Sequence, residues 1–206
     1  MQNSPVKAII FDLGNVLINW DPRHVFNDTY FDSIEKRDHF LEKICSMDWN
    51  ERQDEGRSIV EATQELIAQY PDWESSIRDY YGRWTDMLGG AIPETVEIFR
   101  QLKESGHYKI YALTNWQAGL FDIALVRYAF LHWFDGRVVS GEEKMRKPEP
   151  AFYQRLLDRY NVNPSEALFI DDNLRNIKAA EAMGIRSIHF TNPAALELSL
   201  KELDLL

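Results

Sequence analysis

Five short apolar runs, rich in β-branched and aromatic residues, are spread along the chain of 206 residues. They occupy residues 6–11, 108–113, 137–139, 167–170 and 186–190. Runs of this length and composition predict β-strands. From the second run onward, each is followed by a segment with helical spacing of apolar residues, such as Phe152, Leu156 and Tyr160. This alternation predicts a parallel sheet covered by helices on both faces.

One connection is far longer than the others. Residues 18–92 separate the first predicted strand from the helix that precedes the second, and a simple crossover rarely needs such a length. The segment has helical signals of its own, because Ser58 and Glu61 have the spacing of a capping box and a second helical stretch lies near residues 72–88. We therefore expect a helical insert at residues 18–92 within an α/β core of residues 1–17 and 93–206.

The charge balance limits the partners. Twenty-three Lys and Arg residues against 33 Asp and Glu residues give a formal net charge of −10 at pH 7. Such a surface repels nucleic-acid backbones and acidic membranes, so we expect neither as a partner. An anionic substrate would have to be attracted locally, by a metal ion, one or two placed cations or helix N-termini.

Cysteine content and hydropathy indicate the compartment. Cys45 is the single cysteine, so the chain forms no intrachain disulfide and has no thiolate metal cluster. The N-terminal segment MQNSPVK lacks the features of a secretory leader, and no apolar run approaches the roughly 18 residues that span a bilayer. We expect a cytoplasmic protein.

Polar residues follow the predicted strands, at the sheet edge where open parallel sheets bind ligands. Taken singly, each has an ordinary explanation as a turn residue, a helix cap or a solvated lysine. Together, a carboxylate, hydroxyl and amide donors, a lysine and an acid pair suited to a divalent ion meet the needs of in-line phosphoryl transfer. These candidate residues are Asp12, Gly14, Asn15, Thr114, Asn115, Trp116, Lys147, Asp171 and Asp172.

Four segments, FDLGNVL, LTN, RKPEP and FIDDN, resemble in order the motifs of the haloacid dehalogenase (HAD) superfamily of hydrolases. The resemblance implies a Rossmann-like doubly wound sheet with strand order 5-4-1-2-3, and it implies that the insert is the helical cap domain of that superfamily. Asp12 would be the nucleophile that forms an aspartyl-phosphate. Mg²⁺ would bind the Asp12 carboxylate, the main-chain carbonyl of Gly14 and Asp172, with Asp171 either a further ligand or a neighbour of the ligands.

The same resemblance implies that Thr114, Asn115 and Lys147 hold the oxygens of the transferring phosphoryl group. Mg²⁺ and Lys147 would then provide locally the positive potential that the acidic surface lacks. The implied activity is that of a Mg²⁺-dependent phosphatase acting on a small phosphorylated metabolite.

Gly14 departs from the superfamily pattern. Phosphatases of this superfamily usually have Asp two residues after the nucleophile, as general acid and base, and glycine cannot move protons. A backbone conformation with positive φ would be a structural reason for glycine at this position. Proton delivery would then have to come from water, the cap or the substrate.

The departure leaves alternatives open. A metal-independent 2-haloacid dehalogenase resembles the chain at Asp12 and Lys147, but generally has serine at the positions of Asp171 and Asp172. A signalling receiver or a catalytically impaired phospholigand-binding module is a further alternative. We prefer the phosphatase, because three adjacent carboxylates without a metal ion would repel one another.

The cap should determine substrate choice, because it closes over the sheet edge and excludes water. Asn15, Trp116, Trp20 and Arg23 are the candidates for contact with the substrate. Within the insert we expect at most half of eight residues to contribute, since tryptophan at helical spacing is more often part of a core. These eight residues are Trp20, Asp21, Arg23, Trp49, Asn50, Gln53, Arg57 and Trp84.

Overall fold

A computed structural model describes residues 5–206; residues 1–4, the start of the predicted core segment and of the MQNSPVK segment, lie outside the described residues. Five strands form one sheet with the order β5-β4-β1-β6-β7, and every neighbouring pair is parallel. Numbered along the chain, this is the predicted order 5-4-1-2-3, which is confirmed. The strands are β1 (Ala8–Phe11), β4 (Lys109–Thr114), β5 (Gly136–Val139), β6 (Ala167–Asp171) and β7 (Arg186–His189).

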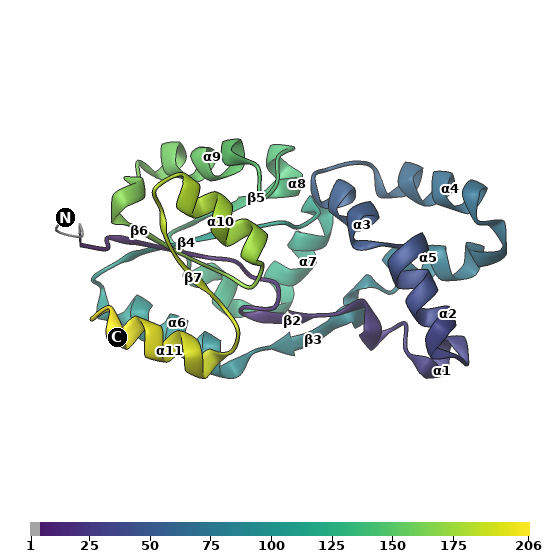
Figure 1. Ribbon diagram of the computed structural model, residues 1–206, viewed down its shortest axis with the longest axis horizontal. Helices are drawn as coiled ribbons and strands as arrows, with labels where there is room; N and C mark the ends of the chain where they lie inside the picture. The colour runs from purple at the N-terminus through teal and green to yellow at the C-terminus, as the bar shows by residue number, and fades with distance from the viewer. Residues whose placement is uncertain (1–4) are drawn as a thin grey trace.

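Helices cover both faces of this sheet (Figure 1). On one face, α6 (Pro93–Ser105), α7 (Ala118–Arg127) and α11 (Pro193–Glu202) pack on a core that includes Ile9 and Phe11 of β1. On the other, α9 (Pro150–Tyr160) and α10 (Leu174–Ala182) cover Ala8 and Ile10. Successive strand residues point to opposite faces, so a continuous apolar run supplies both cores. The predicted α/β sheet with helices on both sides is confirmed.

Between β1 and β4 the chain leaves the sheet and forms a group of helices beside it (Figure 1). The helix α4 begins where the sequence predicts, because the hydroxyl of Ser58 accepts a hydrogen bond from the main-chain amide of Glu61. The helices of the group are α1 (Asp28–Phe31), α2 (Ile34–His39), α3 (Met47–Asp54), α4 (Ile59–Gln69) and α5 (Glu74–Gly82), with a π-helical turn at Phe40–Ile44. Short 3-10 turns lie at Pro22–His24, Pro71–Trp73 and Trp84–Met87 in this group, and at Ala129–Trp133 and Pro164–Glu166 elsewhere.

Aromatic side chains form the centre of this helical group. The Phe26 ring lies 4.8 Å from that of Phe40 and 5.9 Å from that of Tyr80, while Phe40 stacks on Trp73 at 5.8 Å. Aromatic pairs at such distances stabilise a core beyond the area that they bury. The insert therefore has an apolar centre of its own.

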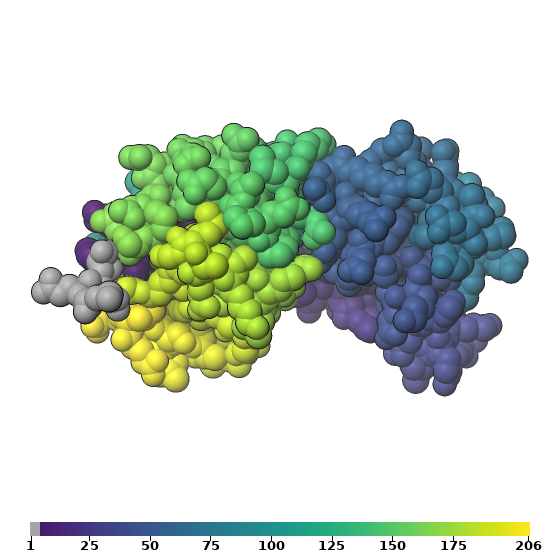
Figure 2. All heavy atoms as spheres, turned by 45° about the horizontal axis from the view of Figure 1, so that its top comes forward, coloured from purple at the N-terminus to yellow at the C-terminus, as the bar shows by residue number. Residues whose placement is uncertain are grey.

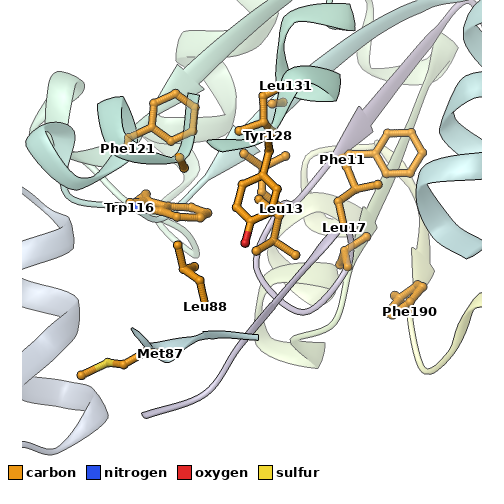
Figure 3. Close-up of a cluster of buried hydrophobic side chains, with 14 of the residues drawn as sticks. Phe11, Leu13, Leu17, Met87, Leu88, Trp116, Phe121, Tyr128, Leu131 and Phe190 are labelled. Atoms are coloured by element: carbon orange, nitrogen blue, oxygen red, sulfur yellow. The ribbon is translucent and has the colours of Figure 1, made fainter. Parts of the chain in front are cut away.

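A two-stranded antiparallel ribbon, which the sequence analysis did not predict, joins this helical group to the sheet. It consists of β2 (Ile18–Trp20) and β3 (Leu88–Ala91). Figure 3 shows that Leu88 at the start of β3 lies in the same buried cluster as Leu13, Trp116 and Tyr128 of the α/β part. Both crossings between the two parts are thus fixed by apolar packing.

Within residues 5–206, none of the helices has both the length and the apolar character needed to cross a bilayer. The short α8 (Ser140–Glu143) follows β5 and lies close to α3 of the insert.

Phe99→Ala should lower the free energy of unfolding by about 3–5 kcal/mol, because it removes a large side chain from a packed core. Phe99 is fully buried, and its ring centre lies 5.6 Å from that of Phe11 and 4.4 Å from that of Phe134. Urea unfolding at constant m-value measures the change. Val126→Ala, at a position 90% exposed, is the control and should change stability by less than about 0.5 kcal/mol. A loss below about 1 kcal/mol for Phe99→Ala would contradict the packing described here.

Candidate active site

Three carboxylates gather where the adjacent strands β1 and β6 end. Phe11 pairs with Ile170, so Asp12 lies beside Asp171 and Asp172. One oxygen from each acid lies within 4.8 Å of the others. Asp12 and Asp171 are buried and Asp172 is half-buried. Negative charges this close and this poorly hydrated repel one another unless cations compensate them.

Lys147 supplies one of these cations. Its side chain is fully buried, and Nζ lies 2.8 Å from Oδ1 of Asp12 and 2.7 Å from Oδ2 of Asp171. The loop that carries it is fixed by Asn115, whose Nδ2 donates to the Lys147 carbonyl at 3.0 Å and whose Oδ1 accepts from the Lys147 amide at 2.8 Å. Lys147 is therefore part of the acid cluster and not a solvated loop residue.

Asp171 uses both of its carboxylate oxygens within the protein. In addition to Lys147, it accepts hydrogen bonds from the main-chain amide of Asn173 at 2.8 Å and from Nδ2 of Asn176 at 3.0 and 3.1 Å. Asp172, in contrast, lines the cavity described below. The two adjacent acids thus differ in their surroundings: Asp171 positions Lys147, and Asp172 faces the space where a ligand would bind.

Burial and charge determine the protonation behaviour of the cluster. Burial raises the pKa of Asp12 to about 8; Lys147 opposes this shift, and the two other acids add to it. Burial, reinforced by the charge of Asp171, also raises the pKa of Asp172. Burial alone would lower the pKa of Lys147, but its two carboxylate partners raise it above the ordinary value, so the ammonium form persists.

The donor set fits a hard divalent cation. When all the groups are ionised, the cluster holds three negative carboxylates and one positive ammonium group. Two negative charges therefore stay uncompensated in a largely buried site. Mg²⁺ would balance them, and oxygen ligands such as carboxylates and main-chain carbonyls are the ones it prefers. Asp12, Asp172 and the carbonyl of Gly14, all at the cavity wall, are the groups available for it.

A cavity of about 160 Å³, partly open to solvent, lies between this sheet edge and helix α3 of the insert. It brings together most of the residues singled out by the sequence. Those from the sheet edge are Asp12, Gly14, Asn15, Asn115, Lys147 and Asp172, and they are joined by Trp20 and Trp116.

Three of the sequence candidates do not line the cavity. Thr114 is buried at the end of β4, and Asp171 is fully buried beside Lys147. Arg23 is exposed and lies 3.7 Å from Asp21 instead, so the structure does not bring it to the site. Of the eight insert residues considered, those at the cavity wall are Trp20, Asn50 and Trp84.

Six cavity residues were missed by the sequence analysis. Half of them come from α3, where Met47, Glu51 and Asp54 have the spacing of one helix face. That spacing is visible in the sequence, but nothing in it tells which face of the helix turns toward the sheet. The others, Asn173, Arg175 and Asn176, directly follow the acid pair.

Helix α3 is attached to the sheet edge by polar contacts. Glu51 forms ion pairs with Arg146 and Arg175, each at 2.5 Å, and so joins the lysine loop to the start of α10. The hydroxyl of Ser140 donates to the Asp54 carbonyl at 2.6 Å and accepts from the Trp116 amide at 2.8 Å. Figure 2 shows the insert in contact with the α/β part along this side.

The backbone does not require glycine at position 14. Its φ is not in the left-handed region, so the expectation of a positive φ as the reason for Gly14 is wrong. The neighbouring Asn15 has the positive φ, 55°. A Cβ at Gly14 would meet no atom within 4 Å. Backbone conformation therefore does not explain the glycine at this position.

Comparisons with known proteins agree with this geometry. A profile of haloacid dehalogenase-like hydrolases matches residues 6–184. The sesquiterpene phosphatase astK of Aspergillus oryzae is 31% identical over 200 residues, which cover 96% of each chain.

Two solved structures share the fold. The HAD family enzyme bt-2542 of Bacteroides thetaiotaomicron, in complex with magnesium and inorganic phosphate, gives a TM-score of 0.68 at 22% identity, covering 90% of this chain and 94% of that one. The L-2-haloacid dehalogenase of Xanthobacter autotrophicus gives 0.60 at 17% identity, covering 96% and 83%. At these identities the likeness shows the fold alone.

Saturating MgCl₂ should raise Tm, because the three acids come together only in the folded chain and an ion held by them would stabilise that state. At about 100 times the dissociation constant the gain is about 2.7 kcal/mol, and each kcal/mol shifts Tm by about 2–4 °C in a chain of this size. Differential scanning fluorimetry against KCl of equal ionic strength measures the shift. Asp172→Asn should lose most of it, whereas Asp122→Asn, at an exposed position of α7, should retain it. An equal rise of Tm in Asp172→Asn and Asp122→Asn would show that the ion binds outside the acid cluster.

Proposed function

Because the chain belongs to the haloacid dehalogenase-like hydrolases, we propose that it is a Mg²⁺-dependent phosphatase that acts on small phosphorylated metabolites through Asp12. The family membership confirms the resemblance indicated by the four sequence motifs. The observation that carries the proposal is the cluster of Asp12, Asp171 and Asp172 around the Lys147 ammonium, open to a cavity on the Asp12 and Asp172 side.

Asp12 acts as the nucleophile in this proposal. Its carboxylate attacks phosphorus, the bond to the ester oxygen breaks, and water later hydrolyses the aspartyl-phosphate. Lys147, 2.8 Å from Asp12, opposes the rise in pKa that burial gives this carboxyl group. Together with Asn115 at the cavity wall, it is available to attract the phosphoryl oxygens. When bound by Asp12, the Gly14 carbonyl and Asp172, Mg²⁺ neutralises charge on the transferring group.

The walls of the cavity support a substrate with an apolar organic group. Trp20, Met47, Trp84 and Trp116 line it together with the acids, and the rings of Trp84 and Trp116 are 5.6 Å apart. Such surfaces bind organic groups by apolar contact, while Lys147 and a metal ion held by the acids would bind the phosphate. The relative named as a sesquiterpene phosphatase agrees with a substrate of this kind.

We further propose that residues 18–92 act as the cap domain of the core formed by residues 1–17 and 93–206. In support, α3 contributes cavity residues and its Glu51 forms ion pairs with both Arg146 and Arg175. A cap held in this way excludes water from the reaction.

Hydrolysis of 4-nitrophenyl phosphate should require Mg²⁺. The variant Asp12→Asn should have no hydrolytic activity but an unchanged circular dichroism spectrum, because it removes the nucleophile and keeps the shape of the side chain. Release of 4-nitrophenol with and without excess EDTA measures this. Full activity in EDTA would overturn the metal-dependent proposal. Halide release from 2-chloropropionate without metal would favour the dehalogenase alternative, and a stable phosphorylated form without turnover would favour the impaired binding module.

Lys147→Ala should lower kcat/KM for the same ester by about 10²-fold or more, since it removes a preorganised cation from the transition state. The steady-state rate is measured at a temperature where circular dichroism shows the variant folded. Lys144→Ala, which changes an exposed lysine directly after α8, is the matched control and should stay within a few-fold of the unmodified protein. A change of only a few-fold in Lys147→Ala would exclude a role for Lys147 in the chemistry.

A further inference from the structure

The proposed phosphatase lacks a proton donor next to its nucleophile, and the inference drawn here rests on that proposed function. When the ester bond breaks, its electron pair goes to the leaving oxygen, which is a strong base in alkyl phosphates and needs a proton. Gly14 has no group that provides one. A donor must therefore come from elsewhere in the cavity.

We propose that Asp54, at the end of α3, is the general acid and base of this reaction. Its side chain lines the cavity that Asp12, Gly14 and Asp172 also line, and it does so from the insert side. A leaving group bound between the sheet edge and α3 would lie between Asp12 and Asp54. The acid that is absent at position 14 is thus replaced by one from the opposite wall.

Elimination among the titratable residues at the cavity wall supports Asp54. Asp12 and Asp172 belong to the cluster that fits a metal ion, and Lys147 is paired with two acids. Glu51 forms ion pairs with Arg146 and Arg175, so its carboxylate oxygens are already engaged. Along the described chain, Asp54 forms no ion pair, and no histidine lines this cavity.

Hydrogen bonds orient the Asp54 carboxyl group. Nδ2 of Asn50 donates to its Oδ2 at 2.9 Å, and Oδ1 of Asn50 accepts from the Tyr81 hydroxyl at 3.0 Å. A proton donor held by Asn50, which is itself fixed by Tyr81 of α5, is positioned before the substrate binds.

The electrostatic surroundings suit proton transfer near neutral pH. Burial, reinforced by Glu51 on the same helix, raises the pKa of Asp54 to about 7, against the opposing charge of Arg146 and the Gln117 amide. Tyr81 of α5 also faces it, and its own pKa is raised, so it stays neutral. An acid with a pKa near the working pH both gives and accepts protons efficiently.

The steps balance as follows. Asp12 attacks phosphorus, the P–O ester bond breaks, and the leaving oxygen takes the proton of Asp54, giving the alcohol, phosphorylated Asp12 and ionised Asp54. Asp54 then accepts a proton from water as the water oxygen attacks phosphorus. The bond between phosphorus and Asp12 breaks, its electron pair returns to Asp12, and inorganic phosphate leaves with Asp54 protonated again.

Asp54→Asn tests the role with little change in shape. The new amide can keep a hydrogen bond with Asn50, because Asn50 can turn its own amide by 180° while the Tyr81 hydroxyl both donates and accepts. We expect kcat/KM to fall by about 10²- to 10⁴-fold for an alkyl phosphate such as glycerol 3-phosphate, and by only a few-fold for 4-nitrophenyl phosphate, whose leaving group needs no proton. With Asp122→Asn, the exposed control, both values should be unchanged.

Two further readouts separate proton transfer from a structural role. The first readout is kcat/KM for the alkyl ester divided by kcat/KM for the aryl ester. In the unmodified protein this ratio should fall above pH about 7, because Asp54 must be protonated to act as the acid. In Asp54→Asn the ratio should be low and independent of pH. Gly14→Asp, placed where a Cβ meets no neighbour, should restore alkyl turnover in the Asp54→Asn background.

Equal losses for alkyl and aryl esters in Asp54→Asn, or no rescue by Gly14→Asp, would overturn the proposal and leave Asp54 as a contact that only positions α3. If the unmodified protein shows no Mg²⁺-dependent turnover of 4-nitrophenyl phosphate, the proposed function itself fails, and the role of Asp54 fails with it. Turnover of the aryl ester therefore distinguishes a failure of the role of Asp54 from a failure of the proposed phosphatase function.

Discussion

The buried ammonium group of Lys147 is the interaction on which the sheet edge depends. It joins Asp12 of the loop after β1 to Asp171 of β6, and so connects two neighbouring strands through a residue from a third part of the chain. Removing one partner from such a buried ion pair typically costs 3–5 kcal/mol, roughly, because the remaining charge stays dehydrated. Asn115, which binds the lysine main chain from the end of β4, extends this connection to another strand.

The sheet was predictable because its strands are buried on both faces, and such strands appear in the sequence as continuous apolar runs. The bounds of the five strands differ from the predicted runs by at most two residues, as in β1, which begins at Ala8 and not at residue 6. The ribbon of β2 and β3 was not predictable in this way. Its strands have three and four residues, and Gly89 and Gly90 give no alternating pattern.

The residues of the candidate site were largely predictable from the sequence, but the different role of each residue was not. Asp171 and Asp172 are chemically identical neighbours, and only the fold shows that one is saturated with hydrogen bonds while the other faces the cavity. Arg23 was a candidate for contact with the substrate, but it is exposed near Asp21 and does not line the cavity. Asp54 was overlooked because its importance comes from the packing of α3 against the sheet edge, which leaves no pattern in the sequence.

The paired strands β2 and β3 have a mechanical consequence for the cavity. Both chain crossings run through this one ribbon, whereas α3 meets the sheet edge through side chains such as Glu51, on the other side of the insert (Figure 1). If the insert rotated about the ribbon, Asp54 on α3 would move relative to the sheet edge, while Trp20, on β2 itself, would move less. The cavity would then have one wall that stays in place, with Trp20, and a second wall that moves with the insert, with Asp54. Affinity provided by the first is independent of closure, and affinity provided by the second is gained only as the cavity shuts.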